Sequence, residues 1–112
     1  MALSDLFSLS NGQVDAQVTK KSPGVYVLDR SVTGGFTAHY AGRSDDDVAK
    51  RLKDHVNDGL YKYFKFEYAT SSKAAFELEC RLYHDLKPPD DDIHPAKPKG
   101  TNYVCPVAYC PL

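Results

Sequence analysis

The segment from residue 63 to residue 69 imposes the strongest constraint on the fold, because its side chains alternate along the chain. Successive side chains of an extended strand point to opposite faces. One face would carry Phe64, Phe66 and Tyr68, and the other would carry Tyr63, Lys65 and Glu67. The pattern therefore predicts a half-buried β-strand.

Two further strands are expected earlier in the chain. Residues 24–28 are β-branched or aromatic and follow the Ser22-Pro23 pair, which punctuates the chain. Residues 36–41 are expected to return antiparallel to them as the second strand of a hairpin. The turn of this hairpin is marked by the Thr33-Gly34-Gly35 stretch.

Helical patterns separate and follow these strands. The first helix is expected from a cap at Ser44 or Asp45 to about residue 57, with Gly59 ending it. Its apolar face would consist of Val48, Ala49, Leu52 and Val56. The second helix is expected from a cap at Ser71 or Ser72 to about Leu86, where the following prolines stop it.

The order of elements, β-β-α-β-α, predicts an α/β fold of the α+β type. We expect a small three-stranded antiparallel sheet flanked by helices, within a single domain that spans residues 1–112. Residues 3–20 are weakly patterned and are expected to form a short helix and a loop.

One residue of the second helix does not fit its surroundings. On a helical wheel, Glu79 lies inside an apolar stripe, whereas Glu77 points to the opposite side. A carboxylate facing the core is costly unless it is paired or binds a metal. An arginine partner and a metal ion are both consistent with the pattern. The stripe consists of Ala75, Leu78, Leu82 and Leu86, with Phe76 and Tyr83 at its edge.

Composition limits the partners and the location of the protein. The net charge of −1 argues mildly against tight, non-specific DNA binding. No apolar run approaches the roughly 20 residues of a membrane span, and the N-terminus lacks the pattern of a signal peptide. We therefore expect a cytoplasmic protein without a membrane partner.

Several landmarks together resemble the signature of the GIY-YIG nucleases. Gly24-Val25-Tyr26 and Tyr40-Ala41-Gly42 resemble the two triplets that name this family. Arg51-Leu52 and, four residues past the arginine, His55 follow in the family's order. Glu79 lies nine residues before Pro88, which is the family's spacing in its closing helix. The resemblance covers residues 24–88.

The resemblance also has departures and a geometric requirement. Val25 and Ala41 replace isoleucines of the triplets, and the distance from Tyr40 to Arg51 is one residue longer than in many members. A shared site needs Tyr26 and Tyr40 on one face of the hairpin. We therefore expect Tyr26 to pair with Tyr40 across a longer loop centred on Thr33.

The family resemblance implies phosphodiester hydrolysis with one Mg²⁺ or Mn²⁺ ion, for which Glu79 would be the protein ligand. Tyr26 would be the general base, with Tyr40 beside it. Nearby positive charge from Arg43 and Arg51 would lower the pKa of Tyr26. Arg51 would also hold the phosphate, and His55 would assist proton transfer.

Two functional readings follow. The first is a metal-dependent DNA endonuclease acting on duplex or branched DNA. The second is a non-catalytic nucleic-acid-binding or adaptor module that keeps the GIY-YIG fold. In either case, a homodimer or a partner protein would supply specificity that so short a chain lacks.

The Pro-rich tail, residues 89–112, contains candidate zinc ligands. Its His94-Pro95 and Cys105-Pro106 pairs resemble elements of some small stand-alone members of the family, although its Cys-x4-Cys spacing departs from their Cys-Pro-x-Cys ending. A tetrahedral Zn²⁺ site is one interpretation, and idle thiols are the other. The candidate ligands are Cys80, His84, His94, Cys105 and Cys110.

Overall fold

A computed structural model describes residues 3–30, 38–88, 90 and 94–107 of the chain. The elements follow in the order β1 (Phe7–Ser8), α1 (Asn11–Gln17), β2 (Gly24–Asp29), β3 (Tyr40–Ser44), α2 (Val48–Asp58), β4 (Tyr63–Tyr68) and α3 (Ser72–Leu86). The α+β class and the order of the main elements are confirmed. Within these described residues, no helix is long and apolar enough to cross a membrane.

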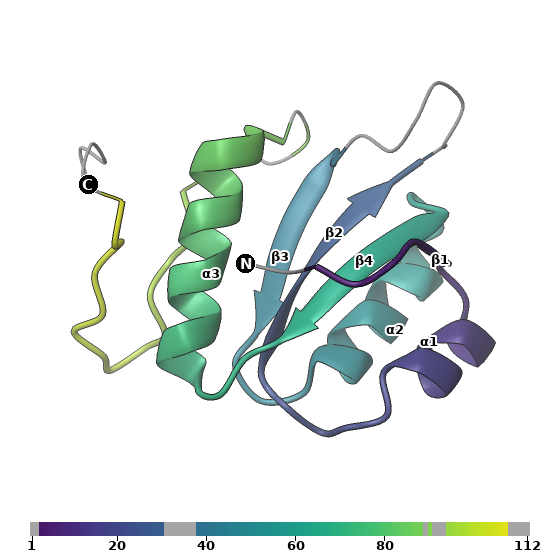
Figure 1. Cartoon of the computed structure of the whole chain (residues 1–112), viewed down its shortest axis with the longest axis horizontal. Coiled ribbons are helices and arrows are strands. Elements are labelled where there is room, and N and C mark those ends of the chain that lie inside the picture. Colours follow the sequence, from purple (N-terminus) through teal and green to yellow (C-terminus); the bar gives the residue numbers. More distant parts are fainter. Residues whose placement is uncertain (1–2, 31–37, 89, 91–93, 108–112) are drawn as a thin grey trace.

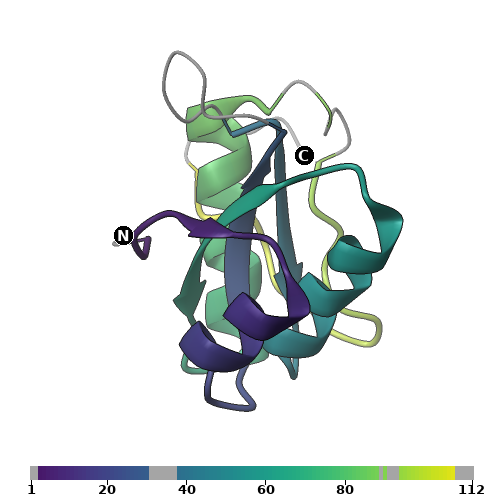
Figure 2. The same cartoon turned by 90° about the vertical axis from the view of Figure 1, so that its right-hand side faces the viewer.

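The sheet has four strands in the described part of the chain, one more than expected, in the order β1-β4-β2-β3. All neighbouring strands are antiparallel. Helix α3 covers one face, and α1 and α2 cover the other (Figures 1 and 2). The expectation for residues 3–20 missed β1, since a strand of two residues is too short to show alternation.

Strand β2 is the centre of the fold, and all of its residues are buried. Tyr26 and Leu28 join the hydrophobic cluster under α1 and α2, whereas Val25 and Val27 join the cluster under α3. Because β2 is covered on both faces, it lacks the alternation that β4 shows. The predicted faces of β4 are confirmed in part, with Phe64 and Phe66 buried.

The register of the hairpin differs from the predicted one. Tyr26 pairs with Gly42, and Tyr40 pairs with Leu28, so the pairing of Tyr26 with Tyr40 was wrong by two residues. An even shift keeps the two tyrosines on the same face, as the shared site requires. The cause is steric: a Cβ at Gly42 would lie 2.5 Å from the Tyr26 hydroxyl oxygen, so only glycine fits opposite this ring.

The predicted turn of the hairpin, with Thr33, Gly34 and Gly35, lies outside the described residues, as do residues 36 and 37 at the start of the expected returning strand.

The helix ends show which polar residues are committed to capping. Asp47, rather than Ser44 or Asp45, caps α2 by accepting a hydrogen bond from the Lys50 backbone N–H. The Ser44 hydroxyl instead accepts hydrogen bonds from the backbone N–H groups of Asp46 and Asp47, just before α2. Gly59 ends α2 in a left-handed conformation, as expected. Asp45 is therefore available for another partner.

Helix α3 begins and ends as expected, with its N-cap at Ser71 and its last residue at Leu86. Its apolar stripe is shorter than predicted, because Leu86 is 44% exposed. Lys87 adopts a left-handed conformation just before Pro88 and closes the helix.

We expect Gly42→Ala to destabilise the protein by about 1–3 kcal/mol, the usual cost of overpacking a core. The new methyl group would meet the ring of Tyr26, which is fully buried. Chemical denaturation of both variants would measure the free energy of unfolding. Gly12→Ala is the matched control, since a Cβ there meets nothing within 4 Å. Equal stability of the two variants would contradict this packing argument.

Candidate active site and metal group

A cavity of about 250 Å³ lies beside β3, the strand at one end of the described sheet order. Five of the six residues predicted as catalytic contribute to its wall, from β2, β3, α2 and α3. The other lining residues are Gly42, Asp45 and Ala96, none of which was predicted as a site residue. The predicted residues that line it are Tyr26, Tyr40, Arg43, Arg51 and Glu79.

Glu79 is buried, 9% exposed, and its Oε1 atom accepts a hydrogen bond of 2.7 Å from Nη1 of Arg43. The arginine partner, one of the two interpretations of this core-facing carboxylate, is thus confirmed. The pair also explains how α3 tolerates a charge on its buried face, because each ion compensates the other.

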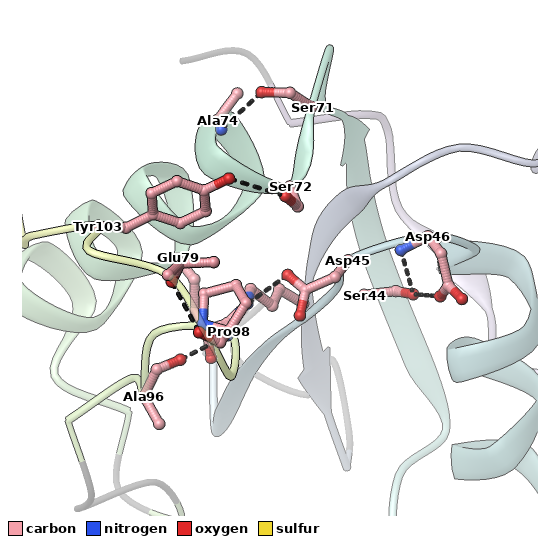
Figure 3. Close-up of polar contacts among 12 residues, drawn as sticks. Ser44, Asp45, Asp46, Ser71, Ser72, Ala74, Glu79, Ala96, Pro98 and Tyr103 are labelled. Atoms are coloured by element: carbon pink, nitrogen blue, oxygen red, sulfur yellow. Dashed lines mark hydrogen bonds and ion pairs between the residues drawn. The ribbon is translucent and has the colours of Figure 1, made fainter.

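Arg43 has two more oxygen partners. Its Nε donates to Asp45 at 2.9 Å, and its Nη2 donates to the backbone carbonyl of Ala96. Figure 3 shows Glu79, Asp45 and Ala96 converging from α3, the β3–α2 turn and the tail. Burial acts to lower the pKa of Arg43, but hydrogen bonds and charge from Asp45 and Glu79 outweigh it and raise the pKa. The guanidinium therefore stays charged.

Tyr26 is fully buried, and its hydroxyl lies 2.8 Å from Nε2 of His55. Burial raises the pKa of Tyr26, and Tyr40 raises it further. Arg51 acts to lower that pKa by its charge and by a hydrogen bond, but does not outweigh burial. The expected lowering by the arginines was therefore wrong in net direction. The side chain of Arg51 is 51% exposed, so solvent screens its charge.

His55 lies behind the cavity wall and contacts the site through Tyr26. Burial, and then the charge of Arg51, lower the pKa of His55, so the imidazole is neutral at pH 7. Its Nδ1 lies 3.6 Å from Oδ2 of Asp58 and forms no hydrogen bond. When the ring proton is on Nδ1, Nε2 accepts the hydrogen bond of the Tyr26 hydroxyl. His55 is thus placed to take the proton of Tyr26.

A second group of side chains includes Cys80, which follows Glu79 on α3. The ligand atoms of Cys80, His94 and Cys105 all lie within 4.8 Å of one another, and the group can hold a metal ion. Both thiols are free. The ring of His84, a further predicted ligand, lies 5.2 Å from that of His94 but is not part of this group. Cys110 lies outside the described residues.

The chain matches no family model, no curated protein and no solved structure. The resemblance of residues 24–88 to the GIY-YIG signature therefore stays a prediction from the sequence.

We expect His55 in the folded protein to titrate below its ordinary pKa of 6.5, because burial disfavours the imidazolium. The unfolded chain then binds the proton more readily than the folded one. The free energy of unfolding should consequently fall as the pH drops below about 6.5. His55→Gln should remove this part of the fall. NMR titration of the imidazole and denaturation at two pH values would measure both effects, and a titration midpoint at or above 6.5 would contradict the assignment.

Proposed function

We propose that the protein is a metal-dependent endonuclease that hydrolyses phosphodiester bonds in DNA. The observation that carries the proposal is the convergence of Tyr26, Tyr40, Arg43, Arg51 and Glu79 on one cavity. These residues come from four different elements, and their order along the chain is the order that the GIY-YIG resemblance requires. Two arginines, a buried carboxylate and two tyrosines around one cavity are typical of a functional site, because stable packing does not require so many polar side chains to lie together.

The charges at the cavity support a role for a divalent cation. Arg43 and Arg51 balance Asp45 and Glu79, so the wall alone has no excess positive charge to attract a phosphate. Glu79 is the proposed ligand, because its carboxyl group lines the cavity and the ion pair with Arg43 favours the carboxylate form that a metal ion needs. Mg²⁺ or Mn²⁺, when bound there, would stabilise negative charge on the leaving oxygen.

Arg51 is the proposed phosphate-binding residue. Its side chain is half-exposed, unlike that of Arg43, whose side chain is only 12% exposed and held by three oxygen atoms. A guanidinium reaches two phosphate oxygens at once and stays charged at any physiological pH. Arg51 would thus hold the substrate, while Arg43 would hold Glu79.

Tyr26 is the proposed base for the attacking water, and His55 makes that role feasible. A buried phenol with a raised pKa does not lose its proton readily at pH 7. The neutral imidazole at 2.8 Å supplies an acceptor, so Tyr26 can pass its proton to His55 as it takes one from water. Tyr40 lines the same cavity and would position that water.

The main alternative is a non-catalytic nucleic-acid-binding or adaptor module. The net charge of −1 favours it, since a nuclease without a basic surface needs help to hold DNA. A homodimer or a partner protein would supply that help in either case, and duplex and branched DNA are both candidate substrates.

We expect Glu79→Gln to lower Mg²⁺-dependent DNA cleavage by about three orders of magnitude, since metal ions supply several kcal/mol to such reactions. Tyr26→Phe should lower it by about 10²–10⁴, the usual contribution of general base catalysis. A cleavage assay over duplex, branched and single-stranded DNA would measure both. Glu77→Gln is the matched control, because Glu77 lies on the same helix but does not line the cavity.

Undiminished cleavage by Glu79→Gln would refute the proposal. Binding to DNA that weakens in Arg51→Ala, with no cleavage by the unaltered protein, would instead establish the binding module. Thermal unfolding of each variant would confirm that the fold is intact.

We further propose that the ion of the Cys80–His94–Cys105 group is Zn²⁺. Two thiolates and an imidazole are ligands that select zinc over magnesium or calcium. Thiolates about 2.3 Å from a tetrahedral zinc lie roughly 3.8 Å apart, so small side-chain movements would bring the present atoms into place. His84, Cys110 or water would be the fourth ligand. Free thiols also suit the reducing cytoplasm, the proposed location.

Elemental analysis of protein purified without chelators should find one zinc per chain. Cys105→Ser and His94→Gln should each lower that stoichiometry. The described residues supply only three ligands to the group, so the loss of one leaves too few to hold zinc. Comparison of His84→Gln with Cys110→Ser would identify the fourth ligand. If the purified protein contains no zinc, the cysteine thiols do not form a zinc site.

A further inference from the structure

Between His94 and Cys105, the tail runs along α3 and then turns back, so that Cys105 lies close to His94. His94 packs against Tyr83, with ring centroids 5.5 Å apart, near the C-terminal end of the helix. Tyr103 reaches the N-terminal half, where its hydroxyl lies 3.3 Å from that of Ser72. Cys105 then lies beside Cys80, in the same group as His94. The two ends of the segment therefore meet at the candidate metal site.

This segment, residues 94–105, contributes Ala96 to the wall of the cavity. The Ala96 carbonyl accepts a hydrogen bond from Nη2 of Arg43. On the other side of the segment, the Tyr103 ring lies 6.3 Å from that of Phe76, and the Arg43 guanidinium lies over the same Phe76 ring at 5.2 Å. Figure 3 shows the Tyr103 hydroxyl directed at Ser72 of α3.

Little regular structure holds the segment in place. It contains no helix or strand, and its internal hydrogen bonds include those from the Thr101 backbone and side chain to the Pro98 carbonyl. Ala96 and its neighbour Lys97 are exposed. Closing such a segment at its base removes much of the conformational entropy that would otherwise open it.

We propose that a metal ion bound by Cys80, His94 and Cys105 is a clasp that closes residues 94–105 into a loop and thereby holds Arg43 against Glu79. The clasp lies outside the cavity and takes no part in chemistry. It acts through the Ala96 carbonyl, which fixes one side of the guanidinium while Glu79 and Asp45 hold the others. The effect on catalysis rests on the proposed nuclease function, whereas the effect on the loop does not.

The adjacency of Glu79 and Cys80 in the sequence gives the clasp a second link to the cavity. Neighbouring residues on a helix point about 100° apart, so α3 presents Glu79 to Arg43 and Cys80 to the tail. Both side chains are buried. A metal bound at Cys80 would therefore restrain the same helical turn that positions the proposed magnesium ligand.

Amide hydrogen exchange, followed by mass spectrometry, tests the clasp directly. Zinc-loaded protein should protect the amides of residues 94–105, and removal of zinc with a chelator should raise their exchange rates at least about tenfold, the scale set by loop closure. Cys105→Ser and His94→Gln should exchange fast with or without zinc. Both substitutions lie in the tail, so they avoid the fully buried Cys80. Lys99→Gln is the control, since this exposed residue lies in the same loop.

The link to Arg43 has its own test. Arg43→Gln should raise exchange around Ala96 even in zinc-loaded protein, while zinc stoichiometry stays at one. In cleavage assays, Cys105→Ser should lower kcat, because Arg43 and Glu79 lose a fixed wall, and Lys99→Gln should not. Stoichiometric zinc with loop exchange that is unchanged by chelation would overturn the clasp, as would the absence of zinc. Zinc-dependent protection in a protein that cleaves no DNA would support the clasp and refute the nuclease.

Discussion

The ion pair between Arg43 and Glu79 is the interaction around which this small protein is organised. A carboxylate on the buried face of α3 would be costly without a partner, and burying a lone guanidinium would be costly too. The pair solves both problems at the edge of the sheet, at a distance of 2.7 Å. The remaining donors of Arg43 then recruit Asp45 from the β3–α2 turn and the Ala96 carbonyl from the tail. One side chain thereby connects the sheet, a turn, a helix and the tail.

The sequence predicted the parts of the fold that depend on local pattern. Gly59 and Ser71 set helix ends where capping chemistry requires them, and the alternation of residues 63–69 identified β4. The failures have physical causes. Strand β1 is too short to carry a pattern, and it exists because its two residues pair with β4. The hairpin register depends on the volume available opposite Tyr26, a tertiary property that spacing does not reveal.

For the candidate site too, sequence patterns predicted which residues come together but not how their folded surroundings alter them. The resemblance to the GIY-YIG signature implied one site for Glu79, Arg43 and Tyr26, helical periodicity singled out Glu79 independently, and the structure places all three on the cavity. Spacing did not reveal how deeply the Tyr26 ring is buried, and burial reverses the expected direction of its pKa. Ala96 was missed because it acts through its backbone carbonyl, a group that every residue has. Asp45 was missed because its role depends on Asp47 taking the helix cap.

The contact between Tyr26 and Gly42 has a consequence for how this protein can change over time. The two positions share a single volume, since the ring on β2 occupies the space that a side chain on β3 would need. A larger residue at position 42 costs less stability when the ring at position 26 has been replaced by a smaller side chain. Such a double change passes through an intermediate with either a clash or a cavity. The two positions are therefore coupled, so that the free-energy cost of a substitution at one of them depends on the residue at the other.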